Sequence, residues 1–408
     1  MMRHYTRYLA FILFISSFAL FACGKHSGPG ENGQSISELP APFATTSSTN
    51  SPKIVPRPDG AQLHVPAGFV VEEYAADFKI PRWMVQAPNG DVFVAEVGAN
   101  KITVLRGNSS KGKPEARFEF ATGLNLPFGM AFHGDYFYVA NTDSVVRFPY
   151  KAGQTQAEGT PEKILDLPGK GYNQHWTRNI LFSRDGKKLY VTVGSETNVD
   201  VETDPRRAAI SEYDPDGGSR RVYASGLRNP IGLAFYPGTN TLWTSVNERD
   251  GLGDDLVPDY VTSVKDGGFY GWPYYYLGPH EDPRRKGEKP ELANTVIVPD
   301  VLLRSHVAAL GLIFYTGSQF PGEYDNDALV ALHGSWNRAQ RVGYKIVRIH
   351  FKDGKPTGEP EDFLTGWLID PAKTDVWGRP VGLLQLNDGS LLVADDGGNK
   401  IWRVSYKR

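Results

Sequence analysis

The sequence of 408 residues contains a single cysteine, Cys23, so no disulfide can form within the chain. It also lacks a basic excess: 44 Lys and Arg face 46 Asp and Glu, a formal net charge of −2. Without an overall positive field, no nucleic-acid partner is expected. No CxxCH haem motif is present, so electrons released by any redox reaction must pass to a separate acceptor.

The sequence has one long hydrophobic run, over residues 8–22, which follows Arg3 and Arg7 at the N-terminus. No comparable run occurs in the rest of the sequence. The length of this run suits a signal-peptide core and is short for a membrane span. The run ends in the letters LFAC, which resemble a bacterial lipobox, and we expect residues 1–22 to be a lipoprotein signal peptide and Cys23 the lipidation site. The expected location is a lipid anchor in the cell envelope facing the periplasm, on the outer membrane in a Gram-negative host. The alternative is an incidental cysteine in an ordinary signal peptide.

Residues 23–53 are rich in Gly, Ser, Thr and Pro and lack apolar periodicity. This composition predicts a flexible tether between the lipid anchor and a folded domain over residues 54–408.

One pattern recurs in the folded domain: a small or polar start, an apolar strand, a turn with glycine, and a second apolar strand. The six copies cover residues 82–105, 127–148, 177–195, 230–246, 310–335 and 380–404. Their turn glycines are Gly90, Gly134, Gly186, Gly238, Gly322 and Gly389, at steps of 44 to 84 residues. Such periods are typical of propeller blades, and 44 Gly, 29 Pro and 12% aromatics suit short strands and turns. The sequence therefore predicts an all-β fold, a single six-bladed β-propeller.

Two further segments complete this prediction. Residues 69–78 form a strand-like stretch ahead of the first copy, and we expect them to complete the sheet of the last blade and cap an open edge. The longest step contains an insertion over about residues 247–306, and loops of that length are more often functional than structural. An immunoglobulin-like array is less well supported because nothing between the copies resembles a linker.

Basic side chains recur just before the first strand of several copies. In a propeller these strands line the central channel, so equivalent positions converge on one axis. The converging set is Arg82, Arg178, Arg228, Arg379, Asn229 and His175. Each arginine alone fits a salt-bridged loop residue. Together they predict a confined positive charge that is costly without an anionic ligand, and guanidinium forks suit carboxylates or phosphates.

The insertion carries the opposite charge, since Glu248, Asp250, Asp254, Asp255 and Asp259 lie close together between glycines. Such segments can wrap Ca²⁺, although the spacing is not that of an EF-hand, and a solvated acidic loop is an equal alternative. Two aromatic side chains, Trp272 and Trp336, offer faces that stack on sugar rings but also fit a packing role.

Four motifs carry a family resemblance: GLRNPIGLAF, NERD…LGDDLVPDY…GGFYGWP, HWTRNILFSRDGKKLYVTVGS and HGSWNR. Over residues 66–406 the chain resembles the soluble pyrroloquinoline quinone (PQQ)-dependent sugar dehydrogenases, and within them the L-sorbosone or pyranose dehydrogenase branch. The resemblance implies oxidation of a sugar or a sugar-derived aldehyde by hydride transfer to PQQ, held on the propeller axis beside Ca²⁺. Electrons would then pass to an external cytochrome or quinone.

The resemblance also implies roles for individual residues. His175 is the implied catalytic base. The implied cofactor contacts are Arg82, Arg178, Arg228, Asn229, His333, Arg338 and Arg379. The implied calcium-binding region comprises Glu248, Arg249, Asp250 and Asp255, partly through backbone carbonyls.

One position departs from the aldose-oxidising branch of that family. There an aspartate follows a glycine and orients the histidine base, whereas here the segment reads Gly194-Ser195-Glu196. A histidine base needs its second nitrogen held to fix the tautomer, and either Ser195 or Glu196 is available for this role. Two other functions stay open on the same fold: a calcium-dependent lactonase, which would not require the arginines, and a cofactor-free binding platform on the cell envelope.

The anchoring prediction is tested by Cys23→Ser, which should release the protein from membranes or block its processing. Removing the acylated side chain removes the acyl chains on which stable membrane attachment depends. Metabolic labelling with a fatty acid and membrane fractionation measure the effect, and lipid labelling that persists in the variant would contradict the assignment.

Overall fold

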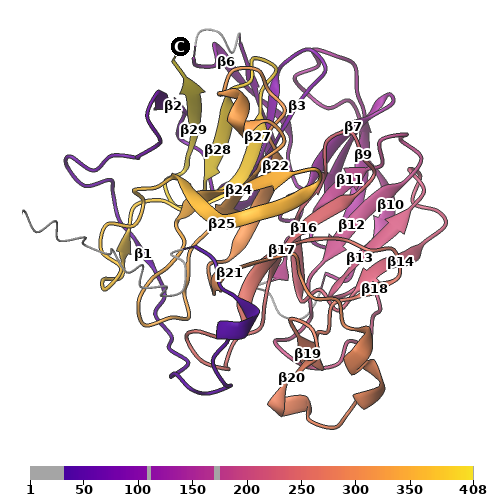
Figure 1. Cartoon of the computed structure of the whole chain (residues 1–408). Coiled ribbons are helices and arrows are strands. Elements are labelled where there is room, and N and C mark those ends of the chain that lie inside the picture. The colour runs from indigo at the N-terminus through magenta and orange to yellow at the C-terminus, as the bar shows by residue number, and fades with distance from the viewer. Residues whose placement is uncertain (1–31, 108–111, 170–174, 408) are drawn as a thin grey trace, which may run out of the picture.

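The computed structural model describes residues 32–107, 112–169 and 175–407 and forms a six-bladed β-propeller, as the repeats predict (Figure 1). The predicted signal peptide and Cys23 lie outside the described residues. In the parts of the chain that are described, none of the helices is long and apolar enough to cross a membrane.

Each blade is a sheet with four main strands, and successive blades follow one another along the chain. The first contains β3 (Pro81–Gln86), β4 (Val92–Glu96), β5 (Lys101–Arg106) and β6 (Ala116–Ala121). The second contains β7 (Met130–His133), β8 (Tyr136–Ala140), β9 (Ser144–Pro149) and β10 (Glu162–Asp166). The third contains β11 (Ile180–Phe182), β12 (Leu189–Val193), β13 (Ala209–Tyr213) and β14 (Arg221–Ser225), extended by the short parallel strand β18 (Gly268–Phe269).

The remaining blades follow the same plan. The fourth contains β15 (Asn229–Phe235), β16 (Leu242–Asn247), β17 (Pro258–Ser263) and β21 (Val301–Ser305). The fifth contains β22 (Ala309–Phe314), β23 (Ala328–Leu332), β24 (Lys345–Lys352) and β25 (Lys355–Leu364). The sixth contains β27 (Pro380–Gln385), β28 (Leu391–Asp395), β29 (Lys400–Tyr406) and, from the other end of the chain, β2 (Phe69–Ala75).

Short elements connect and decorate the blades. They are the pair β1 (Lys53–Ile54) and β26 (Asp375–Val376), the hairpin β19 (Tyr275–Tyr276) and β20 (His280–Glu281), and the 3-10 turns η1 (Ile36–Glu38), η2 (Val97–Ala99), η5 (Pro283–Arg285), η6 (Pro290–Thr295) and η7 (Gly322–Tyr324).

The predicted closing strand is confirmed. β2 pairs antiparallel with β29, from Phe69 opposite Tyr406 to Ala75 opposite Ile401 (Figure 1). The ring of Phe69 lies edge-on to Phe320 of the fifth blade, with centroids 4.8 Å apart, so the closing strand is also packed against the neighbouring blade.

Blade-to-blade packing explains the apolar runs in the sequence. Each sheet lies between two others, so the inner strands are buried on both faces and lose the alternation of a half-exposed strand. All five residues of β4, β12, β23 and β28 are buried. Five of the six turn glycines have positive φ, from 55° to 93°, whereas Gly322 instead begins η7.

The predicted insertion over residues 247–306 is corrected in one respect. It contains β17 and β21, the two outer strands of the fourth blade, because the apolar PDYVTS and VLLRS segments pair there. The excursion beyond the ordinary blade is therefore the stretch between these strands, which carries β18 to β20 and η5 to η6 (Figure 1).

The structure also differs from the predicted tether. Residues 32–53 run along the propeller and form backbone hydrogen bonds with it, including Gln34 N–H to Leu302 O at 3.3 Å and Phe43 N–H to Leu252 O at 2.7 Å. Local composition favours a tether, but these bonds are made to residues more than 200 positions away, which local composition does not reveal.

Candidate active site

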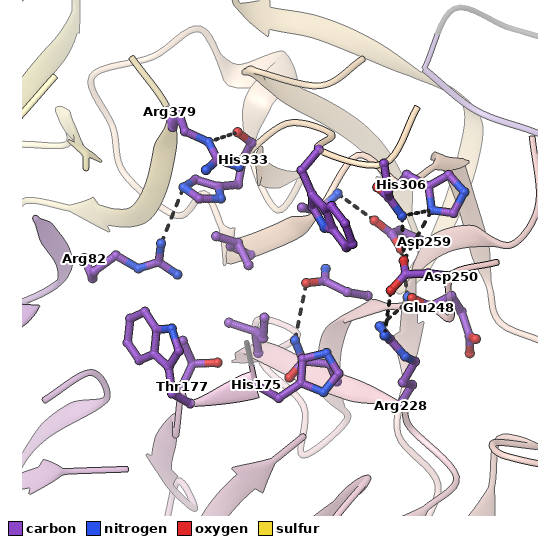
Figure 2. A pocket seen from close by; sticks show the side chains of 18 residues that line it. Arg82, His175, Thr177, Arg228, Glu248, Asp250, Asp259, His306, His333 and Arg379 are labelled. Atoms are coloured by element: carbon purple, nitrogen blue, oxygen red, sulfur yellow. Dashed lines mark hydrogen bonds and ion pairs between the residues drawn. The ribbon is translucent and has the colours of Figure 1, made fainter. Parts of the chain in front are cut away.

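A cavity of about 270 Å³ lies on the propeller axis, at one mouth of the channel (Figure 2). Its wall comes from the starts of innermost strands and from the loops beside them. The predicted residues that line it are Arg82, His175, Arg228, Asn229, Glu248, Asp250, His333, Trp336 and Arg379. The structure thus brings together side chains from five blades, as the shared position in the repeats predicts.

Arg82, His333 and Arg379 form a basic side of the cavity (Figure 2). Arg82 pairs with the carboxylate of Asp396, and His333 Nε2 lies 2.9 Å and 3.0 Å from the two oxygens of that carboxylate. Burial lowers the pKa of His333 to about 3, so the ring is neutral and donates Nε2–H to Asp396. Burial acts to raise the pKa of Asp396, but His333 and Arg82 hold it well below its ordinary value.

The positive charge is therefore largely compensated inside the protein, contrary to the sequence prediction. Arg82 pairs with Asp396, and Arg228 pairs with Asp250 at 3.0 Å. Arg379 differs, because its hydrogen bonds within the described chain go to backbone carbonyls, although the charge of Asp396 also acts on it. Nε donates to His333 O at 3.2 Å and Nη2 to Gly334 O at 3.0 Å. Arg379 is thus the cavity guanidinium best suited to an incoming anion.

Two predicted arginines lie elsewhere. Arg178 shares the repeat position of Arg82, but its guanidinium is buried and donates to four backbone carbonyls, those of Thr142, Pro168, His175 and Thr177. Burial lowers its pKa to about 9. It supports the backbone that carries His175 and does not line the cavity. Arg338 pairs with Asp255 and donates to Asp254 O outside the cavity.

The geometry around His175 fixes its tautomer. Nδ1 lies 3.0 Å from Ser195 Oγ and 3.1 Å from Ser195 O. The Ser195 hydroxyl donates to Thr197 O at 2.6 Å, so its oxygen accepts, and Nδ1 must carry the hydrogen. The lone pair then lies on Nε2. Of the two residues available for this role, Ser195 supplies the contact to Nδ1.

The electrostatic surroundings keep this histidine neutral. Burial lowers the pKa of His175 well below its ordinary value of 6.5, and the positive charge of Arg228 lowers it further. A neutral imidazole with its lone pair on Nε2 is the form that a general base requires.

Carboxylates and amides line the opposite side of the cavity, near Asp250 and Asp259 (Figure 2). Both oxygens of Asp259 accept backbone N–H bonds, from Glu248 at 2.8 Å and from Ala308 at 2.6 Å. Burial raises its pKa to about 7. Asn337 Nδ2 joins this side by donating to Asp250 Oδ1 at 2.6 Å.

Sequence reasoning missed several lining residues. Asp259 was noted only as part of an acidic run, and Asn247, His306 and Asn337 were not singled out. These residues reach the cavity through contacts between distant parts of the chain, which the local sequence does not reveal. For example, His306 Nε2 lies 2.9 Å from Gly253 O, 53 residues away in the sequence.

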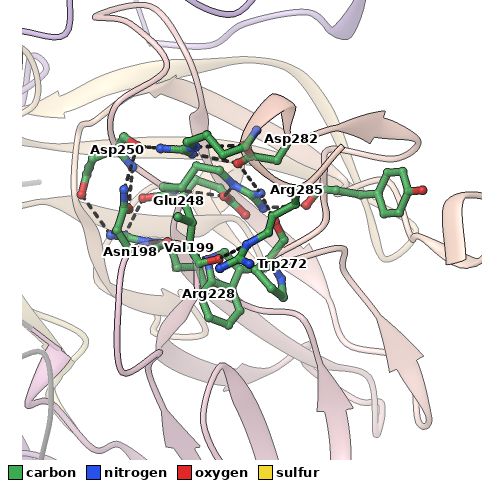
Figure 3. A network of polar contacts seen from close by, with 12 residues as sticks. Asn198, Val199, Arg228, Glu248, Asp250, Trp272, Asp282 and Arg285 are labelled. Carbon is green, nitrogen blue, oxygen red and sulfur yellow. Dashed lines mark hydrogen bonds and ion pairs between the residues drawn. The ribbon is translucent and has the colours of Figure 1, made fainter. Parts of the chain in front are cut away.

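The predicted calcium-binding region does not converge on one site. The carboxylate of Glu248 accepts from Arg249 Nε at 3.0 Å, and Arg249 also pairs with Asp282 at 3.1 Å (Figure 3). This buried network attaches the excursion to the fourth blade, because Arg249 also donates to Pro273 O and Tyr275 O of the excursion. Asp255 pairs with Arg338, so Asp250 alone among the four directs its carboxylate to the cavity wall. Among the described residues, no group of three His, Cys, Asp or Glu is placed to hold a metal ion.

The two predicted aromatic residues also separate. Trp336 is half-buried and lines the cavity. Trp272 is 2% exposed and donates Nε1–H to Asn198 O at 2.9 Å, so it packs within the excursion and belongs to the network of Figure 3.

The comparisons with known proteins agree with this fold. The TrAA12-like family model matches residues 63–261 and 282–407, so the chain is a β-propeller that belongs to the TrAA12-like family. An uncharacterized protein of Borreliella burgdorferi is 30% identical over 85% of this chain and 91% of its own length. A pyrroloquinoline quinone-dependent pyranose dehydrogenase of Coprinopsis cinerea is 24% identical over 84% of this chain, and the match spans 54% of the dehydrogenase.

Solved structures show the same architecture. The calcium structure of the Trichoderma reesei family AA12 enzyme superposes with a TM-score of 0.73 at 21% identity, covering 87% of this chain and 99% of that one. The holo form of the Coprinopsis cinerea pyranose dehydrogenase PQQ domain gives 0.71 at 21% identity, with coverages of 86% and 98%. The family and the fold are thus established, whereas the sorbosone branch stays a prediction.

The state of His175 is directly testable. In protein labelled with ¹⁵N-histidine, the ring of His175 should remain the neutral Nδ1–H tautomer at pH 6.5 and titrate only well below it. Arg228→Gln should raise that pKa because it removes a nearby positive charge, while Arg184→Gln, on the exposed surface, should not. A His175 ring that is protonated at pH 6.5 in the parent would contradict the assignment.

Proposed function

We propose that this chain is a PQQ-dependent dehydrogenase that oxidises a sugar or a sugar-derived aldehyde. The observation that carries the proposal is the presence, in one cavity, of a neutral Nδ1–H histidine, His175, and an arginine, Arg379, whose hydrogen bonds within the described residues go to backbone carbonyls. The first suits removal of a proton from a hydroxyl group, and the second suits a carboxylate of the cofactor. The names of the Coprinopsis cinerea relative and of its PQQ domain support the same cofactor.

The described residues fit an anionic, flat cofactor. Arg82, Arg228 and Arg379 reach the cavity from three blades. Four buried atoms of lining residues, Thr177 Oγ1 and Glu248 Oε1 among them, lack a hydrogen-bond partner among the described residues. The other two are the donor Arg82 Nε and the acceptor Asn229 Oδ1. Buried polar atoms are rarely left unpaired in native proteins, so both are suited to a ligand that offers an acceptor and a donor.

PQQ, when bound, would supply an acceptor for the hydride and its two electrons. His175 Nε2 takes the proton of the substrate hydroxyl as the carbon–hydrogen bond breaks, which leaves a carbonyl product. Ser195 keeps the proton of Nδ1 in place throughout. His175 then passes its new proton to solvent, and the electrons leave to an external acceptor, a cytochrome or a quinone.

Calcium has weaker support than PQQ. Of the predicted ligands, only the Asp250 carboxylate faces the cavity, and its oxygens already accept from Asn337 and Arg228. No step of this mechanism uses the ion.

Trp336 and the acidic side offer a place for the sugar. An aromatic face next to hydrogen-bonding carboxylates and amides is typical of sites that bind small polar ligands. The lactonase alternative needs no arginines, whereas three line this cavity.

The predicted lipid anchor bears on the electron acceptor. An acylated Cys23 would tether the propeller to a membrane, which favours a membrane quinone or a cytochrome as the acceptor.

Cofactor binding is tested by Arg379→Ala. Loss of one partner of a charge-assisted pair costs about 2–5 kcal/mol, or about 30-fold to several thousand-fold in affinity for PQQ. Arg184→Ala is the control, because Arg184 is exposed and lies outside the cavity, so its loss should leave the affinity unchanged. Titration of the purified apoprotein with PQQ, followed by ultraviolet-visible absorbance, measures both. Equal affinity of Arg379→Ala and the parent would refute the cofactor assignment.

The chemical role of His175 is tested by His175→Ala. The variant should bind PQQ normally but reduce it about 100-fold to 10,000-fold more slowly with sugar, the usual contribution of a general base. Glu196→Gln should have almost no effect, since Ser195 holds the ring. Stopped-flow absorbance of PQQ reduction, over a panel of pyranoses and sugar aldehydes with a dye as final acceptor, provides the rates. Parental rates in His175→Ala would rule out the assignment.

A further inference from the structure

One side chain near the N-terminus ties down a loop of the cavity wall. Asn50 Nδ2 donates to Arg338 O at 3.2 Å and to Ala339 O at 2.9 Å, and its Oδ1 accepts from Arg341 Nη2 at 2.8 Å. Its backbone N–H donates to Trp336 O at 2.7 Å. A single residue thus makes four hydrogen bonds to residues 335–341, the rim loop.

The rim loop depends on such contacts because it contains no strand or helix of its own. Its backbone carbonyls need partners from elsewhere, and Asn50 supplies them. Arg341 is buried, 2% exposed, and its guanidinium donates to neutral oxygens of the described chain, including Asn50 Oδ1 and Ser51 O. Removing Asn50 would leave a buried charged donor short of a partner, which is costly.

The rim loop also carries two residues of the cavity wall, Trp336 and Asn337. Asn337 Nδ2 lies 2.6 Å from Asp250 Oδ1 and 3.0 Å from His306 Nδ1. A shift of the loop would therefore move both the aromatic face and the amide that holds Asp250.

A second set of bonds attaches the same N-terminal segment to the loop that follows Asp250. Ser48 donates to the Asp254 carboxylate through its backbone N–H at 2.9 Å and its hydroxyl at 3.1 Å. That carboxylate also accepts the N–H of Ala339 at 2.8 Å. The segment over residues 43–51, here named the strap, thus joins the rim loop to the loop that follows Asp250.

The strap lies outside the family match, which begins at residue 63. We infer that the strap supports the active-site wall in this chain and that Asn50 is a positioning residue, which acts through the rim loop to set the affinity for the sugar. The inference rests on the proposed function for its substrate. Its structural part, the fixing of the rim loop, does not.

The test compares Asn50→Ala with Thr49→Ala, a change at the exposed neighbouring position. Asn50→Ala should accelerate amide hydrogen exchange over residues 335–341 by about tenfold or more, since the variant loses three side-chain hydrogen bonds, each worth about 1 kcal/mol. It should raise KM for the sugar about 3-fold to 10-fold and change kcat little, because His175 is untouched. Asn50→Asp, which keeps the acceptor for Arg341, should lie between Asn50→Ala and the parent. PQQ titration and thermal unfolding check that each variant remains folded and loaded.

The outcomes separate the two claims. Unchanged exchange over residues 335–341 in Asn50→Ala would overturn the positioning role, and faster exchange with an unchanged KM would overturn its link to the substrate. If the parent oxidises no sugar at all, the proposed function fails, while hydrogen exchange still decides whether Asn50 fixes the rim loop.

Discussion

The pairing of β2 with β29 is the contact on which the rest of the structure depends. It joins residues separated by more than 300 positions into one sheet and closes the ring. A closed ring forces the innermost strands of all six blades to start around a common axis. Residues that are ordinary strand starts in sequence, such as Arg82, Asn229 and Arg379, thereby become neighbours in space. The cavity is a consequence of closure, and its chemistry depends on what each blade places at that position.

Closure also creates an electrostatic problem, which the protein solves locally. Arginines that converge on an axis would repel one another if each stayed unpaired. Asp396 forms an ion pair with Arg82, and Asp250 forms one with Arg228. Each pair stabilises the charged form of both partners. Arg379 is left with carbonyl oxygens. The folded protein is thus nearly neutral at its axis and still presents one guanidinium that gains from an anion.

The sequence predicted the fold well because the signal is repeated. Six copies with turn glycines at blade-like steps specify six sheets, and five of those glycines adopt the positive φ that the turns require. The same alignment misplaced Arg178, because two residues at one repeat position need not point the same way. The guanidinium of Arg178 donates hydrogen bonds to nearby backbone carbonyls, whereas Arg82 pairs with Asp396. The strap was part of the predicted tether because its sequence is polar. In the structure its polar groups form hydrogen bonds with distant backbone groups, and the local sequence does not reveal these partners.

The replacement of an aspartate by Ser195 at the histidine has a chemical consequence. A carboxylate beside Nδ1 would fix the tautomer and also stabilise the protonated ring, which raises basicity. The hydroxyl and carbonyl of Ser195 fix the tautomer without adding negative charge. His175 is therefore always available as a base near neutral pH but is a weaker one. The pairing of Arg228 with Asp250 then matters for the chemistry as well as for binding, because Asp250 offsets the positive charge that depresses the pKa of His175. Since Asp250 is held in turn by Asn337, the rim loop and the strap are connected to His175 through a series of charged and hydrogen-bonded side chains.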